Sequence, residues 1–534
     1  RGEGTGFSGS PGKGLRSALP RPNGAEARGS AYGLWHNESD RTLLRGLLPP
    51  ARREADMRIL YVIAEAAPFI KVGGLADVGY GLPRALRAMG HDVRVVLPRY
   101  RAIPGSAYDL RPLRPPLPVP LGLAGEIRAV EVEVSETTGV PTYFLWDEGY
   151  FGRDRVYGYP DDPQRFIFFC RAALALLRHL DWQPEILHGN DWHTGFLFLW
   201  LATVGRRDRF YRPIATVFTV HNMAYQGITG DALLAFGGIS EHVDRLEVEP
   251  PGHINWLARG IAHADAVNTV SPRYAREILT PEFGFGLEPL LRRRADRLVG
   301  ILNGLDPEAW DPRTDPALAA RFDAETLERR AENKRAAQEA FGLPVREEIP
   351  LFAFIGRLIE QKGLPLLLEA AEALFARGIQ MAVLGTGMPE YEAALAAWPD
   401  RFPGQAGVRL AHDERLARLL YGGADVFLMP SKFEPCGLGQ MIAMRYGALP
   451  LVHAVGGLAD TVLDIDQEAG TGFVFSPFSV EAFLTAVDRA LALYADRPAW
   501  RAAQRRAMSR DFSWSASARA YEDLYRRALA WHNP

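Results

Sequence analysis

The sequence predicts an α/β protein made of two Rossmann-like, doubly wound domains that face each other across a cleft. Short continuous apolar runs alternate with longer segments of helical periodicity from residue 57 onward, which is typical of parallel strands buried on both faces. This series of strands stops after Asn303 and begins again at residue 351. The chain of 534 residues is also too long for one core and fits two or three domains of about 100–200 residues.

The first domain is predicted over residues 57–303. In open α/β sheets ligands bind outside the carboxyl ends of the strands, so functional residues are expected where these strands end. The strand candidates are 58–64, 92–97, 129–134, 142–146, 185–188, 214–220, 266–270 and 298–302.

The second domain is predicted over residues 304–515, after a turn-rich stretch and a polar helix at 325–341. The final segment, 516–534, contains an amphipathic helix at 516–530 that we expect to dock back on the first domain. The strand candidates of the second domain are 351–355, 381–384, 426–429, 449–452 and 472–475.

Residues 1–56 differ from the rest of the chain. They are rich in Gly, Arg, Ser and Pro, and a clear strand pattern starts directly after Met57. We interpret them as a disordered or non-native leader. The segment lacks the apolar core of a secretory signal, and its scattered acidic residues argue against an organelle transit peptide.

Composition limits the class of protein. A net charge of −3 gives no global basic field for nucleic acid, and no apolar run approaches the ~20 residues that span a membrane. The two cysteines, Cys170 and Cys436, are too few for a disulfide framework and lack the spacing of zinc ligands. We therefore expect a cytoplasmic protein without nucleic-acid or membrane partners.

Candidate binding residues follow several strands of the first domain. The segment 71–77 reads KVGGLAD, in which the glycines let the backbone approach a ligand and Lys71 supplies a cation for a phosphate. A plain tight turn explains this loop equally well. His221 lies in TVHNMAYQG at 219–227, and Trp192 offers a flat face for a sugar. For an isolated histidine or tryptophan, a structural hydrogen bond or core packing is the commoner explanation.

The corresponding loops of the second domain carry more charge. The segment 356–363 reads GRLIEQKG, so Arg357 and Lys362 are suited to hold a diphosphate, with a solvated surface pair as the alternative. The segment 431–439 reads SKFEPCGLG. Here Glu434 is suited to face positive charge at an anomeric carbon, while the following backbone N–H groups are suited to bind a leaving phosphate.

One acidic pair, Asp464 and Asp466, has the spacing of some metal-dependent sugar transferases. It lies in an acidic turn beside Asp460 and Glu468, so a solvated loop is the better interpretation. We predict no catalytic metal.

Together these elements resemble the bacterial glycogen synthase and plant starch synthase family over nearly the whole chain from Met57. Their number and order argue against chance. The resemblance implies the GT-B fold and a retaining transfer of glucose from ADP-glucose to the non-reducing end of an α-1,4-glucan such as glycogen, with neither metal nor cofactor. Further shared motifs are SPRYAREI at 271–278, TPEFG at 280–284, LNGLD at 302–306, GGLADTV at 456–462 and DFSW at 511–514.

The resemblance also implies roles for single residues. His221 is expected to contact the transferred glucose, Glu434 to stabilise positive charge without acting as a nucleophile, and the leaving diphosphate to help draw in the acceptor hydroxyl. The expected catalytic residues are His221, Glu434, Arg357 and Lys362. The expected donor-binding residues are Lys71, Gly74, Asp77, Asn303, Gly437, Leu438, Gly439 and His412, and the expected acceptor-binding residues are Tyr157 and Trp192.

The chain departs from the family pattern at several positions. Gly439 stands where Thr is frequent, which removes one hydroxyl near the phosphates, and His412 stands where a Tyr is expected under the adenine. Gly356 and Ile359 replace small polar residues, and Asn190 stands where a second His is usual. None of these changes removes a charged group that the chemistry needs, so we expect an active enzyme.

The sequence leaves two alternative functions open. Another GT-B enzyme (sucrose synthase-like, trehalose-forming or a glucan phosphorylase) is less favoured, because the segments 71–77 and 219–227 match the synthases and no pyridoxal phosphate lysine motif is found. A non-catalytic glucan-binding protein would have lost some of the charged site residues, and all are present. The preference for ADP over UDP, the acceptor length and the oligomeric state stay open.

Overall fold

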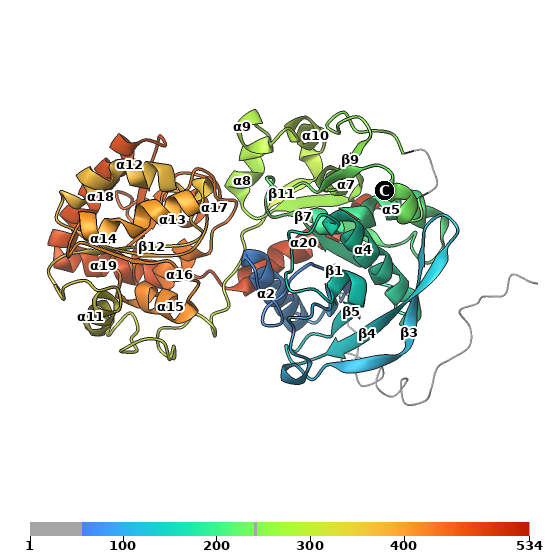
Figure 1. The fold of residues 1–534 in the computed structure, drawn as a ribbon, viewed down its shortest axis with the longest axis horizontal. Coiled ribbons are helices and arrows are strands. Elements are labelled where there is room, and N and C mark those ends of the chain that lie inside the picture. The colour runs from blue at the N-terminus through green and yellow to red at the C-terminus, as the bar shows by residue number, and fades with distance from the viewer. Residues whose placement is uncertain (1–55, 240–242, 533–534) are drawn as a thin grey trace, which may run out of the picture.

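A computed structural model of the chain describes residues 56–239 and 243–532, so all but the last residue of the predicted leader lies outside the described residues. Two α/β domains lie side by side (Figure 1). The first, coloured blue to green, is on the right of the view, and the second, coloured yellow to red, is on the left. None of the described helices is long and apolar enough to cross a membrane.

The first domain is built on a nine-stranded sheet with the order β11-β10-β7-β6-β1-β2-β5-β4-β3. Its strands pair in parallel, except that β4 runs antiparallel to both β3 and β5. The strands are β1 (Arg58–Val62), β2 (Asp92–Pro98), β3 (Arg111–Leu121), β4 (Glu126–Ser135), β5 (Thr142–Trp146), β6 (Ile186–Asn190), β7 (Ala215–Val220), β10 (Ala266–Thr269) and β11 (Leu298–Gly300), with a separate small sheet of β8 (Ile228–Gly230) and β9 (His253–Asn255).

The second domain contains a six-stranded sheet in the order β14-β13-β12-β15-β16-β17, in which every pair is parallel. These short apolar strands are buried because helices cover both faces of the sheet (Figure 1). They are β12 (Leu351–Ile355), β13 (Gln380–Leu384), β14 (Ala406–Arg409), β15 (Val426–Met429), β16 (Leu449–His453) and β17 (Phe473–Phe475).

Every strand predicted from the sequence corresponds to a strand of the structure, and the predicted fold class is confirmed. The structure adds four strands that were not predicted, the short β8, β9 and β14 and the long β3. β3 contains five prolines, including Pro115 and Pro116. Proline cannot donate to a strand ladder, but β3 is the edge strand of its sheet, where the missing donors are tolerated. The expectation of parallel strands is wrong for 129–134, because β3 and β4 form an antiparallel hairpin.

Helices connect and cover both sheets. In the first domain they are α2 (Gly74–Ala88), α3 (Glu148–Phe151), α4 (Asp162–His179), α5 (Gly195–Thr203), α6 (Leu233–Phe236), α7 (Trp256–His263), α8 (Pro272–Glu277), α9 (Pro281–Gly284) and α10 (Glu288–Arg293). In the later part of the chain they are α11 (Arg330–Ala340), α12 (Leu364–Phe375), α13 (Pro389–Ala396), α14 (Trp398–Arg401), α15 (Glu414–Gly423), α16 (Gly439–Arg445), α17 (Gly456–Thr461), α18 (Val480–Ala495), α19 (Arg497–Met508) and α20 (Trp514–His532).

The last helix, α20, lies against the first domain although it follows the second in sequence (Figure 1). Its apolar face is buried beside α2, β7 and β10. Two buried tyrosines fix its position: the Tyr525 hydroxyl lies 2.8 Å from His188 Nδ1, and the Tyr521 hydroxyl accepts a hydrogen bond from Asn268 Nδ2 at 3.0 Å. The core of the first domain is therefore completed by the end of the chain.

Each sheet has one point where the strand order reverses. In the first sheet β1 lies between β2 and β6, and in the second β12 lies between β13 and β15. At such a switch point the loops that follow the two central strands diverge to opposite faces, which leaves a crevice at the carboxyl edge. The segments 63–73 and 191–194 follow the central strands of the first sheet, and 356–363 and 430–438 follow those of the second.

Candidate active site

The loops at the two switch points meet at the boundary between the domains. The predicted donor loop on the first domain and the start of α16 on the second are in van der Waals range of each other. Several contacts join the two sides. A Cβ placed on Gly74 would lie 3.6 Å from Leu438 Cδ1, and Arg357 Nη1 lies 3.4 Å from the Tyr225 hydroxyl. The Glu277 carboxylate accepts the Gly456 backbone N–H at 3.0 and 3.2 Å.

The loop 71–77 is ordered by two carboxylates. Asp77, in the first turn of α2, accepts a hydrogen bond from Lys71 Nζ at 2.7 Å, which holds the ammonium group over the helix start. Glu65 Oε2 accepts the backbone N–H groups of Val72 and Gly73 at 2.6 and 3.0 Å. These two amides are therefore used internally, so the loop offers a substrate its lysine and the helix start rather than all its amides.

Glu65 is a site residue that the sequence analysis missed. It is almost fully buried, and its second oxygen lies 3.2 Å from the Tyr157 hydroxyl, which donates to it. Burial raises the pKa of the Glu65 carboxyl, against the hydrogen bonds that lower it. One buried carboxylate thus ties the expected donor loop to the expected acceptor aromatic. Its only sequence signal is an acidic residue shortly after a buried strand, which is not specific.

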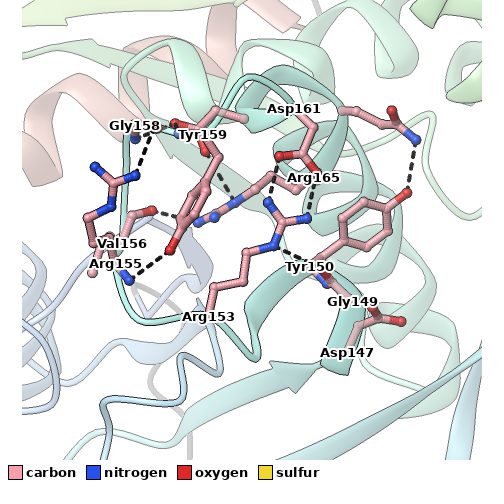
Figure 2. Close-up of polar contacts among 12 residues, drawn as sticks. Asp147, Gly149, Tyr150, Arg153, Arg155, Val156, Gly158, Tyr159, Asp161 and Arg165 are labelled. Carbon is pink, nitrogen blue, oxygen red and sulfur yellow. Dashed lines mark hydrogen bonds and ion pairs between the residues drawn. The ribbon is translucent and has the colours of Figure 1, made fainter.

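The segment that carries Tyr157 is fixed by arginines (Figure 2). Arg153 forms a bidentate ion pair with Asp161, with both N–O distances at 2.6 Å. Arg165, which is fully buried, donates to the Val156 carbonyl at 2.5 Å. These contacts lie on both sides of Tyr157 and hold the backbone of the segment. The ring itself packs against Phe166 and His193.

His221 follows β7 and is partly buried. Its backbone N–H donates to Asp191 Oδ1 at 2.7 Å, and its ring nitrogen Nε2 lies 2.9 Å from Asn190 Oδ1. Desolvation lowers the pKa of His221 to about 3, so the ring is neutral at physiological pH.

Asp191 was not assigned a role from the sequence, but its backbone is unusual. Its φ of 54° is in the left-handed region, which non-glycine residues rarely adopt. Burial raises the pKa of its carboxyl to about 7, although the backbone N–H groups of His221 and Asn222 bind it. Strained backbone and perturbed titration are common at functional sites, and no local sequence pattern reports either property.

Trp192 packs against the core of the first domain, which the sequence analysis gave as the commoner explanation for an isolated tryptophan. Its ring lies 5.4 Å from Phe166 and 4.3 Å from His193, measured between centroids. A Cβ at Gly227, where φ is 64°, would lie 2.2 Å from the indole. The glycine therefore lets the 219–227 turn cover Trp192, and only part of the ring remains exposed.

On the second domain, Lys362 and Glu434 form an ion pair across the switch point. Lys362 Nζ lies 2.6 Å from Glu434 Oε2, and the Ser431 hydroxyl donates to the same oxygen at 2.9 Å. The Glu434 side chain is 8% exposed and that of Lys362 is 20% exposed. The pair therefore lies at the edge of the protein, with the carboxylate beneath the ammonium group.

The two other predicted residues of this domain with basic side chains are more open. Arg357 is exposed, and its side chain hydrogen-bonds only to the Tyr225 hydroxyl among the described residues, at the distance given above. His412, the expected partner of the adenine, is also exposed and makes no hydrogen bond or ion pair with any residue that the structure describes.

The turn before α16 is built around Gly437, with φ of 75°. Gln440 holds this turn, because its Nε2 donates to the carbonyl oxygens of Cys436 and Gly437 at 3.1 and 2.9 Å. Gly439 begins α16 against Phe427. Gln440 was also missed by sequence reasoning, since its role depends on the fold of the turn.

Asn303 links the domains. It is buried, its backbone hydrogen-bonds to the Cys436 sulfur, and its side-chain oxygen has no hydrogen-bond partner among the described residues. Buried acceptors are rarely left unsatisfied, so this oxygen is suited to receive a hydroxyl of a bound molecule.

The acidic pair Asp464 and Asp466 is accounted for by an arginine. Arg489 pairs with both carboxylates, and Asp466 is exposed. Across residues 56–239 and 243–532, no group of three or more His, Cys, Asp or Glu side chains is arranged to hold a metal ion.

Known proteins share both halves of this arrangement. The family profile of the starch synthase catalytic domain matches residues 58–293, and that of glycosyl transferases group 1 matches residues 336–507. The glycogen synthase of an Anaeromyxobacter species is 48% identical over 487 residues, which are 89% of this chain and 100% of that protein. The glycogen synthase of Moorella thermoacetica is 44% identical over 484 residues, which are 89% and 97% of the two chains.

A solved structure agrees with these matches. The catalytic domain of starch synthase IV from Arabidopsis thaliana, bound to ADP and acarbose, superposes with a TM-score of 0.83 at 34% identity. The match covers 89% of this chain and 100% of that one. The resemblance predicted from the sequence is confirmed: the chain belongs to the glycogen and starch synthase family of GT-B enzymes and is a glucosyltransferase.

Proposed function

We propose that the enzyme transfers glucose from ADP-glucose to the non-reducing end of an α-1,4-glucan, with retention of configuration and without a metal ion. The observation that carries this proposal is the Lys362–Glu434 ion pair at the switch point of the second sheet. Both a positive and a negative group are then available where a glycosyl-transfer transition state develops charges of both signs.

The leaving diphosphate is assigned to the cations of the second domain. An ammonium group has three N–H donors, and Glu434 uses one of those on Lys362. The guanidinium of Arg357 is exposed and adds a planar fork that suits phosphate oxygens. The remaining N–H donors of both side chains have no partner among the described residues, so they are available to stabilise the diphosphate as it leaves.

Glu434 is assigned an electrostatic role. Its Oε2 accepts from Lys362 and Ser431, whereas its Oε1 accepts no hydrogen bond from any described residue and is available to a glucose hydroxyl. A carboxylate held by an ammonium group is a weak nucleophile, which favours a front-face reaction over a covalent intermediate. His221 and the unsatisfied Asn303 oxygen supply further polar contacts for the glucose.

The remaining candidate residues are assigned either to the donor or to the glucan. Lys71, Gly74 and Asp77 are proposed to contact the donor, together with the turn 437–439 and, at the base, His412. Tyr157 and Trp192 are proposed to contact the glucan. Starch synthase IV was solved bound to ADP and acarbose, which supports a nucleotide-sugar donor and a glucan as the substrates. A cytoplasmic location also remains a prediction.

The test is glucose incorporation by the purified full chain with labelled ADP-glucose or UDP-glucose and a glycogen primer, with and without EDTA. We expect faster incorporation from ADP-glucose, no loss with EDTA, and complete release of the incorporated label by an α-1,4-specific glucosidase. Preference for UDP-glucose would overturn the donor assignment. Transfer to a free sugar in place of glycogen would favour another GT-B activity.

A further inference from the structure

Asn190 is a fully buried residue at the carboxyl end of β6, directly at the switch point of the first sheet. Its Nδ2 donates to the Val62 carbonyl oxygen of the neighbouring β1 at 3.0 Å. A carbonyl oxygen only accepts hydrogen bonds, so the amide can take this place only with its NH₂ group toward Val62. The Oδ1 atom therefore faces the opposite side.

Two groups contact this oxygen. The Tyr61 hydroxyl lies 3.0 Å from it and His221 Nε2 lies 2.9 Å from it. An amide oxygen has no hydrogen to give, so both groups must donate. Burial raises the pKa of Tyr61, which keeps that hydroxyl protonated. The hydrogen-bond pattern thus requires a proton on His221 Nε2.

The other ring nitrogen then carries a lone pair. Desolvation keeps the ring neutral, with only one N–H group. Nδ1 makes no hydrogen bond to any residue in the described part of the chain. The titratable groups packed around the ring are His188 and His193, which burial also keeps neutral, and Asp191, which binds the backbone N–H of His221 and not its ring.

We propose that Asn190 is a positioning residue that fixes the Nε2–H tautomer of His221, so that Nδ1 accepts a hydrogen bond from a hydroxyl of the transferred glucose. The identity of the sugar rests on the proposed function, whereas the tautomer does not. A neutral acceptor suits this site, because a charged imidazolium would oppose the positive charge that develops at the anomeric carbon.

The tautomer is measured directly by ¹⁵N NMR of the full chain labelled at histidine, with the His221 signals assigned by their loss in His221→Ala. We expect Nδ1 to show the chemical shift of an unprotonated nitrogen and Nε2 that of a protonated one. The opposite tautomer, or an imidazolium at neutral pH, would overturn the proposal. A wild type that shows this tautomer but transfers no glucose would refute the proposed function alone.

Three variants then test whether Asn190 is the cause. Asn190→Leu removes the acceptor at similar size and is expected to abolish the tautomer preference and lower kcat about 10²-fold, the scale of a misplaced group. Asn190→Asp adds a negative charge, which is expected to produce an imidazolium at neutral pH and a kcat that recovers as pH rises. The matched control is Tyr61→Phe, which removes the other donor to the same oxygen and is expected to leave the tautomer and kcat near wild type.

A merely structural role would lower stability without changing the tautomer or the pH profile. Folded Asn190→Leu with the wild-type tautomer and kcat would therefore overturn the proposal. If this variant does not fold, the Asn190→Asp pH profile and the wild-type spectrum decide, and a profile identical to wild type counts against the proposal.

Discussion

The two domains place different kinds of polar groups at their shared boundary. On the first, the strand ends carry buried and neutral hydrogen-bonding groups centred on His221 and Asn190, and the buried carboxyl of Glu65 has a raised pKa. The loop 71–77 adds one ion pair that reaches solvent, between Lys71 and Asp77. On the second, the loops carry charges that reach solvent: Lys362 is paired with Glu434, and Arg357 is exposed.

This contrast indicates that the two domains have different roles in the reaction. Buried groups with satisfied partners are fixed before a ligand binds and need no reorganisation during the reaction. Charges at the surface of a domain can exchange their internal partners for those of a substrate. We infer that the first domain sets the geometry of the acceptor and glucose, while the second stabilises charge.

The largest effect is expected from removing the charges of the second domain. Lys362→Ala and Glu434→Gln should each lower kcat about 10²–10³-fold, because each removes a group worth roughly 3–4 kcal/mol in the transition state. The matched control is Lys432→Ala, since Lys432 pairs with Glu360 in the same two loops but is exposed. Steady-state kinetics of the folded variants measures the change in kcat. Near-normal turnover in Lys362→Ala would contradict the assignment of charge stabilisation to the second domain.

A smaller effect is expected from loosening the first domain at Glu65. Glu65→Ala frees the amides of Val72 and Gly73 and the hydroxyl of Tyr157, so both the donor loop and the acceptor aromatic lose their anchor. We expect kcat/KM for donor and for glucan to fall together by about 10-fold or more, as positioning is lost.

The control for Glu65 is Glu148→Ala, whose carboxylate pairs with Arg101 on the surface. It should leave both values of kcat/KM unchanged. If Glu65→Ala lowers the unfolding midpoint while both kinetic constants stay at wild type, Glu65 has only a structural role.

The sequence predicted those structural features that a short-range residue pattern determines. Buried parallel strands appear as continuous apolar runs, so all of them except the short β14 were located from the sequence alone. The edge strand β3 could not, because its prolines argue against a strand until its place at the sheet edge is known. Motif chemistry likewise singled out Lys362 and Glu434 as candidate site residues, but their direct pairing joins residues 72 positions apart and needs the sheet order.

Other site residues depend on conformation, which a local pattern does not report. Asp191 stands out through its backbone angle, and Glu65 through the amides that surround it. Gln440 supports the turn at Gly437 through bonds that exist only once that turn has formed. Sequence patterns therefore found the charged groups of the second domain more readily than the buried network of the first.

A third experiment uses the buried His193 of the first domain and measures how the free energy of unfolding depends on pH. Burial lowers the pKa of His193 to about 3, from 6.5. Between these values the unfolded chain binds a proton that the folded chain does not, so the free energy of unfolding falls as pH falls. The slope from this residue is at most about 1.4 kcal/mol per pH unit. Asp191, with its pKa raised to about 7, acts in the opposite sense between its ordinary value of 3.8 and 7, because there the folded chain holds the extra proton.

His193→Phe isolates the histidine contribution, since Asp191 is common to both proteins. The phenyl ring keeps the stacking on Tyr157 and Trp192. Over one pH unit below 6.5, we expect denaturant unfolding to show wild type losing about 1 kcal/mol relative to the variant. If the difference in the free energy of unfolding between the two proteins does not change with pH, His193 is protonated in the folded enzyme as it is in the unfolded chain.

The smallest expected effect is the salt dependence of KM, which should differ between ADP-glucose and glycogen. Raising potassium chloride from about 0.1 M to about 1 M shortens the Debye length from about 10 Å to about 3 Å, so KM for ADP-glucose should rise about threefold. KM for glycogen should stay constant, because Tyr157 and Trp192 present aromatic faces and the groups behind them are buried. Arg357→Gln, which removes an exposed cation of the site, should raise KM for ADP-glucose and flatten its salt dependence. A parallel rise of both constants in wild type would mean that salt acts on the whole molecule, and the assignment of charge stabilisation to one domain would then fail.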